Sequence, residues 1–168
     1  MRGEIMERLW APWRGEYVGK EQPAGCVLCQ KPKEADDEGN YLLARGRFAY
    51  VLLNLYPYNN GHLMVAPYRH VGELEDLGPE EWQEITALLT RAVKCLKAVY
   101  RPHGFNLGVN LGRVAGAGIP GHLHWHVVPR WEGDANFMPV VGQTKVLPES
   151  LDSTYARLRS AWEELPGQ

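Results

Sequence analysis

Apolar and polar positions along the chain repeat with two different periods, which separate predicted helices from predicted strands. Between residues 79 and 100 the apolar side chains recur every three or four residues, the spacing of one face of an α-helix. The run Gly78-Pro79-Glu80-Glu81 is a typical helix start, with proline and acidic residues in the first turn. The pattern therefore predicts one long helix over 79–100. The apolar positions that support it are Trp82, Ile85, Leu89, Val93, Leu96 and Val99.

A second helical stripe lies near the C-terminus. The segment Pro148-Glu149-Ser150-Leu151 opens it, and apolar residues at 151, 155, 158 and 162 share one face. This pattern predicts a C-terminal helix over 148–165.

Four shorter apolar segments predict strands. Segments 48–55 and 62–67 flank a turn rich in proline, asparagine and glycine, which favours a hairpin. Segments 105–111 and 122–129 follow the long helix. Because the strands and the long helix do not alternate as βαβ units, the order indicates an α+β fold with a meandering antiparallel sheet.

Length and charge limit the classes of function. A chain of 168 residues with 45% hydrophobic residues fits one domain over 1–168, with an aromatic-rich N-terminal arm at 1–20. The net charge of -2 argues against a protein that binds nucleic acid non-specifically. The sequence has no signal-peptide pattern and no apolar run of the roughly 20 residues that a membrane span needs. We therefore expect a cytoplasmic protein without a membrane partner.

Three histidines, His122, His124 and His126, occupy alternate positions of the last predicted strand. Alternate strand residues point to the same face, so we expect the three imidazoles to lie together. A neutral imidazole, with an ordinary pKa of about 6.5, is a good nucleophile toward phosphorus, and the middle residue is the candidate nucleophile. Three imidazoles can also bind zinc. The spacing leaves both interpretations open.

Cys26 and Cys29 form a Cys-x-x-Cys motif, which is typical of half a zinc site. A thioredoxin-like redox pair is the alternative, but the sequence indicates no strand before the motif and no helix after it. The third cysteine, Cys95, falls in the helical pattern as a core residue. The missing ligands are therefore expected to be histidines, with His70 and His122 as candidates.

A glycine-rich loop at 112–121 precedes the histidine strand, and its backbone N–H groups can approach an anion. Residues 116–121 match Gly-x-Gly-x-x-Gly, but Pro120 and the following strand do not fit the helix that a dinucleotide fingerprint opens. The lysine and hydroxyl of a Walker loop are also absent. We therefore predict a phosphate cradle. Its candidate substrate contacts are Gly116, Gly118, Ile119 and the strand-end residues Asn54 and Asn110.

These features together resemble the histidine triad (HIT) family, whose signature is His-x-His-x-His followed by apolar residues, here 122–128. The resemblance covers about residues 26–134 and includes Asn54, the segment 61–67, and Asn110-Leu111-Gly112 with the loop that follows. Residues 124–137 and the N-terminal run Leu9-Trp10-Ala11-Pro12-Trp13-Arg14 look like the bacterial branch related to diadenosine tetraphosphate phosphorylases.

The resemblance implies a homodimer of α+β protomers that binds a purine nucleotide. His124 would attack the α-phosphorus of an adenine nucleotide and form a nucleotidyl-histidine, with His126 and the loop N–H groups stabilising the phosphoryl charge. Water or inorganic phosphate would then release the nucleotide. The resemblance also implies a structural Zn²⁺ held by Cys26, Cys29, His70 and His122.

The chain departs from the family pattern in the loop before the triad. Many members have Gly-Gln or a hydroxyl residue there, whereas this chain has Gly118-Ile119-Pro120. Phosphate contacts would then come from the backbone, His126 or Asn110. Dinucleoside polyphosphates and nucleoside phosphoramidates both stay open as substrates. A nucleotide-binding regulatory protein and a metal-dependent hydrolase with all three histidines as ligands are the alternative functions.

Overall fold

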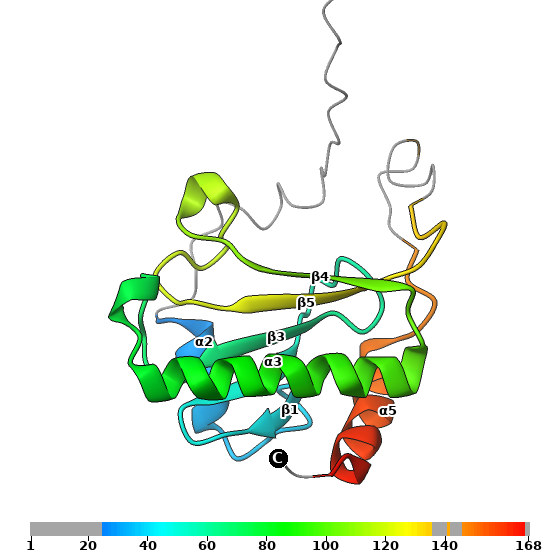
Figure 1. The fold of residues 1–168 in the computed structure, drawn as a ribbon, viewed down its shortest axis with the longest axis horizontal. Coiled ribbons are helices and arrows are strands. Elements are labelled where there is room, and N and C mark those ends of the chain that lie inside the picture. The colour runs from blue at the N-terminus through cyan, green and yellow to red at the C-terminus, as the bar shows by residue number, and fades with distance from the viewer. Residues whose placement is uncertain (1–24, 136–140, 142–145, 167–168) are drawn as a thin grey trace, which may run out of the picture.

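The computed structural model describes residues 25–135, 141 and 146–166. Its centre is a five-stranded antiparallel sheet in the order β1-β2-β3-β5-β4 (Figure 1). The strands are β1 (Leu42–Arg45), β2 (Ala49–Leu53), β3 (Leu63–Pro67), β4 (Gly104–Val109) and β5 (Trp125–Arg130). The long connection through α3 lies between β3 and β4. The edge strand β4 therefore comes earlier in the chain than its inner neighbour β5.

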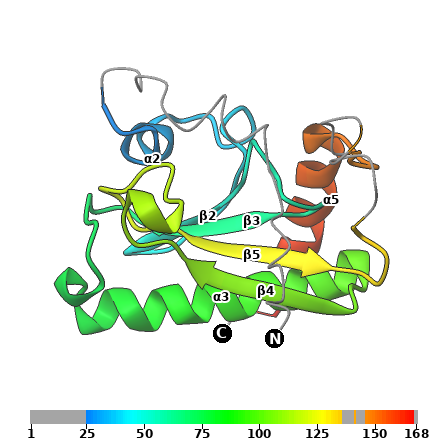
Figure 2. The same cartoon turned by 90° about the horizontal axis from the view of Figure 1, so that it is seen from above.

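Helices lie on both sides of this sheet. The long helix α3 (Pro79–Tyr100) runs along one face, and the short helix α2 (Val27–Gln30) lies on the other (Figure 2). The helix α5 (Leu151–Glu164) contacts α3 and β1. The remaining helical turns are the 3₁₀ segments η1 (Lys31–Lys33), η2 (Leu74–Asp76) and η3 (Arg113–Ala115). No helix in the described ranges is long and apolar enough to cross a membrane.

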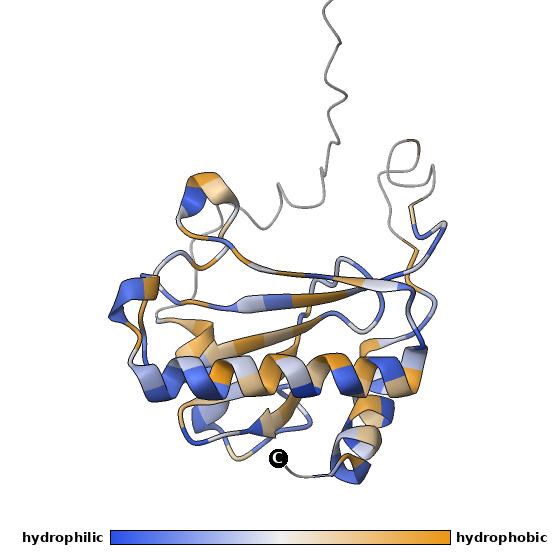
Figure 3. Ribbon diagram, in the orientation of Figure 1, coloured by the Kyte–Doolittle hydropathy of each residue, from blue (hydrophilic) through white to orange (hydrophobic). Residues whose placement is uncertain are grey.

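Two hydrophobic cores form because neighbouring strand residues point to opposite faces of the sheet. The larger core packs residues such as Val51 and Val127 against α3 and α5. The smaller core lies on the other face, where Leu28 of α2 packs with Tyr50 and Ile119. Figure 3 shows hydrophobic residues concentrated in the inner strands and alternating with polar residues along α3. The second core attaches α2 and the glycine-rich loop to the face that carries the candidate site.

The structure confirms the α+β class, the antiparallel sheet, the hairpin and the long helix over residues 79–100. It also confirms the C-terminal helix, although α5 begins at Leu151 because Ser150 caps it with a hydrogen bond from Ser153 N–H to its Oγ. The predicted N-terminal arm at 1–20 lies outside the described residues.

The sheet differs from the prediction in three respects. The strand β1 was not predicted, because three of its four residues are buried and so show no alternation of apolar and polar positions. The sheet is not a meander, since β5 pairs with both β3 and β4. The histidine strand begins at Trp125 rather than His122, because Leu123 N–H bonds the carbonyl of Val71 outside the sheet and a turn at Ile119 precedes it.

The turn between β2 and β3 is held by Glu149. The Glu149 carboxylate accepts hydrogen bonds from Asn60 Nδ2 at 3.1 Å, Arg157 Nη1 at 2.8 Å and the Tyr100 and Thr154 hydroxyls. Burial alone would raise the pKa of Glu149, but these donors outweigh it and lower the pKa to about 2. The carboxylate is therefore ionised at neutral pH and links the turn to α3 and α5.

A second carboxylate, Asp134, holds the neighbouring residue of the same turn. It accepts from Asn59 Nδ2 at 2.8 Å and pairs with Arg130 Nε at 2.6 Å. The Arg130 hydrogen bond is the main reason that the pKa of Asp134 lies well below its usual range. Two ionised side chains thus fix Asn59 and Asn60, and with them the backbone that leads into His62.

Candidate functional site

A backbone carbonyl determines which nitrogen of the His124 imidazole carries the proton. Its Nδ1 lies 2.8 Å from the carbonyl oxygen of His122, and a carbonyl can only accept, so Nδ1 carries the hydrogen. Burial lowers the pKa of His124, which keeps the ring neutral at neutral pH. The lone pair of the neutral ring then resides on Nε2. No described residue forms a hydrogen bond with that nitrogen.

In His126 a chain of hydrogen bonds places the proton on Nε2 rather than on Nδ1. Tyr58 N–H donates to His62 Nδ1 at 3.0 Å, so that nitrogen carries a lone pair. The other nitrogen of His62, Nε2, lies 3.0 Å from His126 Nδ1 and donates to it. A neutral His126 then carries its proton on Nε2. The two neighbouring imidazoles, whose centroids are 5.2 Å apart, therefore present an acceptor at His124 and a donor at His126.

Asn54 and Tyr58 complete the support of His62. Asn54 Nδ2 lies 3.4 Å from His62 Nδ1, and its Oδ1 accepts from the N–H of Tyr56 at 2.9 Å. The Tyr58 ring stacks on His126 with centroids 5.4 Å apart. Asn54, a sequence-predicted site residue, thus lies beside the histidine group and shapes the turn that carries Tyr58.

Cys26, Cys29, His70 and His122 form a separate group that could hold a metal ion. Their ligand atoms all lie within 4.8 Å of one another. Sulfur to imidazole Nδ1 distances are 3.3 Å for Cys26 and His122, 3.3 Å for Cys29 and His70, and 3.4 Å for Cys29 and His122. Tetrahedral zinc with Zn–S and Zn–N bonds of ordinary length separates such ligands by about 3.5 Å. The three sulfur–nitrogen distances are therefore close to those of a tetrahedral zinc site, and the four side chains could hold one ion.

His122 connects this metal-binding group to His124. Its Nε2 donates to the carbonyl oxygen of Pro67 at 2.8 Å, which leaves the lone pair of Nδ1 toward the two thiols. Its own backbone carbonyl accepts from His124 Nδ1. The alternation of the three histidines suggested one group of imidazoles. Instead, the His122 ring faces the metal-binding group. Within the described residues, His122 is the only one of the three that belongs to the metal-binding group.

The glycine-rich loop folds next to these groups. Gly116 adopts a φ of 90°, and its N–H bonds the carbonyl of Arg113 at 2.9 Å. Asn110 Nδ2 approaches the carbonyl of Gly116 at 3.4 Å. Ile119 buries its side chain in the smaller core and its carbonyl accepts from His122 N–H. The loop is therefore attached to the histidine segment at Ile119 and braced at its start by Asn110.

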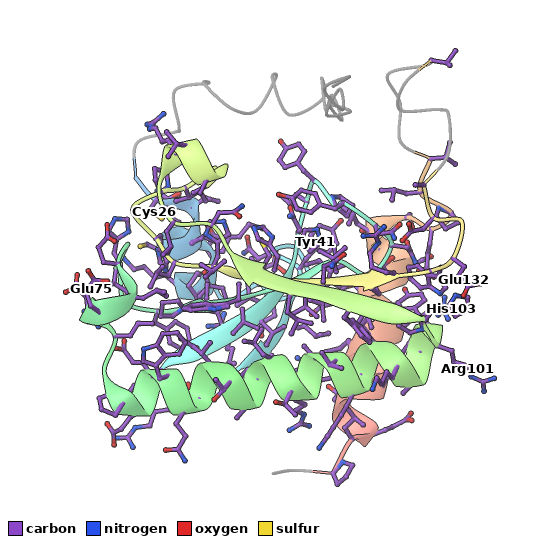
Figure 4. All side chains as sticks on the ribbon, turned by 45° about the horizontal axis from the view of Figure 1, so that its top comes forward. Cys26, Tyr41, Glu75, Arg101, His103 and Glu132 are labelled. Atoms are coloured by element: carbon purple, nitrogen blue, oxygen red, sulfur yellow. The ribbon has the colours of Figure 1, made fainter. Side chains whose placement is uncertain are left out.

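Figure 4 shows that Cys26 and His103 lie at opposite ends of the molecule. Cys26 lies at the end of the molecule occupied by α2 and η3, whereas His103 and Glu132 lie together at the opposite end of β4 and β5. His103 Nδ1 accepts from Glu132 N–H at 3.0 Å, and its side chain is exposed. His103 is thus a histidine remote from both groups.

Residues 42–133, more than half of the chain, match the HIT domain. The chain belongs to the HIT domain family. An AP-4-A phosphorylase of Mycobacterium tuberculosis is 46% identical to this HIT protein over 169 residues, covering 96% of this chain and 87% of the relative. An asymmetrical bis(5'-nucleosyl)-tetraphosphatase of Schizosaccharomyces pombe is 30% identical over 57% of this chain and 52% of that protein.

A solved structure has the same fold as this HIT protein. The Zn-bound histidine triad family protein from Mycobacterium smegmatis superposes with a TM-score of 0.67 at 24% identity, and the alignment covers 83% of this chain and 94% of that chain. This likeness confirms the HIT-like α+β fold that the sequence resemblance implied.

Sequence reasoning did not assign a role to His62 or Tyr58 of this HIT protein. His62 belongs to the predicted hairpin and lies 64 positions before its partner His126. The available signal was the histidine at the start of a strand predicted to pair within the same sheet. That signal was not sufficient, because the pairing of β3 with β5 is what brings the two rings together.

The assigned proton positions can be tested by NMR. Long-range ¹H–¹⁵N spectra of the protein at neutral pH should show His124 with its proton on Nδ1, and His62 and His126 with theirs on Nε2. The reason is that the fixed carbonyl of His122 and the fixed N–H of Tyr58 determine the partner of each ring. Exposed His103 provides a reference signal. A proton on Nε2 of His124 would contradict the assignment.

Proposed function

We propose that this HIT protein is a dinucleoside polyphosphate phosphorylase that transfers AMP from diadenosine tetraphosphate to inorganic phosphate through a covalent intermediate on His124. The observation that carries the proposal is the neutral His124 ring with its lone pair on Nε2, next to an imidazole that offers a proton. The 46% identical relative, named AP-4-A phosphorylase, supports the choice of substrate and acceptor.

The proposed reaction has two displacement steps. In the first, His124 Nε2 forms a bond with the α-phosphorus, and the bond from that phosphorus to the bridging oxygen breaks, so ATP leaves with the electron pair. In the second, an oxygen of inorganic phosphate attacks the same phosphorus and the P–N bond breaks. ADP forms, and His124 regains its lone pair. His126 Nε2–H donates a hydrogen bond to the phosphoryl oxygens in both steps.

The remaining contacts come from residues beside these rings. We assign Asn54 to the ribose side and Asn110 to the phosphate side of the substrate. Gly118 and Ile119 would contribute backbone N–H groups to the phosphate. The N–H of Gly116 is already bonded to Arg113, so Gly116 would act by turning the loop rather than as a donor.

The reaction is tested by incubating the protein with diadenosine tetraphosphate, with and without inorganic phosphate, and separating the nucleotides by chromatography. The wild type should form ADP and ATP only with phosphate. His124→Ala should lose roughly a thousandfold or more in turnover because no nucleophile remains. The matched control His103→Ala should stay within about twofold of the wild type. AMP and ATP formed without phosphate would indicate a hydrolase, and tight nucleotide binding without products a binding protein.

We also propose that the Cys26, Cys29, His70 and His122 group holds a structural zinc ion. The spacing of two thiols and two imidazole nitrogens supports this. The M. smegmatis protein, which has the same fold, is described as Zn-bound. Bound zinc would supply folding free energy by fixing the segment before β5. His122 would position the carbonyl that bonds His124.

Elemental analysis of the purified protein should find close to one zinc ion per chain. Cys26→Ser should remove most of it and lower the thermal unfolding temperature, because a ligand is lost and a folded segment is released. The control Cys95→Ala changes a cysteine in the core, outside the group, and should keep the zinc. Retention of zinc by Cys26→Ser would contradict the site.

We propose that two copies of the chain associate through β4. This strand lies at the edge of the described sheet, and its Leu107 is 49% exposed. An exposed edge with an apolar side chain favours pairing with a second strand. Sedimentation should give a mass near twice 19.0 kDa, and Leu107→Glu should shift it toward one chain. The control Val114→Glu alters a fully exposed residue of η3 and should not. A wild type with the mass of a single chain would contradict this interface.

A further inference from the structure

His126 is contacted by side chains on the β3 side of its ring and faces a glycine on β4. Met64 pairs with it on β3, His62 bonds its Nδ1 and Tyr58 stacks on it. On β4 its partner in the sheet is Gly108. No described residue lies within 4 Å of the position that a Cβ of Gly108 would occupy. The residue that faces His126 on β4 therefore has no side chain, and the space where one would start is open among the described residues.

Gly108 belongs to a polar track along the edge strand. Alternate strand residues share a face, so Asn106 and Asn110 lie on the same face as Gly108 and its partner His126. Arg130 Nη1 donates to Asn106 Oδ1 at 2.7 Å, which fixes the amide and leaves its nitrogen as a donor. Asn106 and Gly108 are exposed. This face thus carries the amide groups of Asn106 and Asn110 with no side chain between them at Gly108. Such a surface can accommodate an extended anion.

The strand order determines which part of a substrate lies on this track. The order β2-β3-β5-β4 places Asn54, after β2, and Gly108, on β4, on opposite sides of His126. A dinucleotide whose ribose lies near Asn54 must continue past His126 toward β4. In-line displacement also places the leaving group away from the attacking nitrogen.

We propose that the face of Asn106, Gly108 and Asn110 is the subsite for the leaving nucleoside polyphosphate, and that Gly108 determines whether so large a leaving group is accepted. The inference rests on the proposed function. Glycine is not required there by the backbone, because its φ is not positive and added atoms meet open space. The missing side chain instead provides the room that the polyphosphate needs beside His126.

The test compares Gly108→Val with Gly104→Val. Both glycines lie on β4, share a face, have ordinary φ values and have open space around the added Cβ. They are four residues and about 13 Å apart. Valine suits a strand, so both variants should fold and associate as the wild type does, which unchanged AMP binding by calorimetry and an unchanged sedimentation mass would verify.

Two substrates separate the leaving group from the transferred nucleotide: diadenosine tetraphosphate and the 4-nitrophenyl ester of AMP, whose leaving group is small. Gly108→Val should lower kcat/KM for diadenosine tetraphosphate by about tenfold or more and keep the ester within about twofold. Gly104→Val should leave both within about twofold. Equal losses on the two substrates, or no loss, would overturn the subsite. A wild type that cleaves neither substrate would instead refute the proposed function.

Discussion

The hydrogen bond from His124 Nδ1 to the carbonyl oxygen of His122 is the contact on which the arrangement of the site depends. It assigns the proton of one imidazole through the backbone, and burial keeps that ring neutral by lowering its pKa. A side-chain partner would have its own rotamers, whereas a backbone carbonyl two residues earlier is fixed by the chain itself. The Nε2 of His124, the proposed nucleophile, is therefore held in place by the chain itself.

The same carbonyl belongs to a residue whose side chain serves the metal-binding group. His122 thus joins the two thiols near α2 to the start of β5, and Leu123 and Ile119 tie the same segment to the two hydrophobic cores. On the other side of the site, the ionised Glu149 and Asp134 hold the turn that presents His62 to His126. Supports on both sides thus place the proton of His124 on Nδ1 and that of a neutral His126 on Nε2.

The sequence predicted most of what depends on local patterns. The helix of 79–100 follows from its period, and Cys-x-x-Cys with two histidines led to the four metal-binding residues that the structure brings together. It did not predict β1, whose buried residues lack alternation. The alternation of the three histidines also suggested one shared face, although the metal-ligand assignment already set His122 apart from the other two. The contact between His62 and His126 was missed because it depends on the non-local pairing of β3 with β5, which neither segment encodes alone.

The most direct measurement of the central claim is mass spectrometry of the protein mixed briefly with diadenosine tetraphosphate in the absence of phosphate and quenched at alkaline pH, where P–N bonds survive. The account predicts an AMP adduct on the peptide that contains His124, attached at Nε2, and its disappearance with release of ADP when phosphate is added. Product formation without any adduct, or an adduct on a different side chain, would contradict the account.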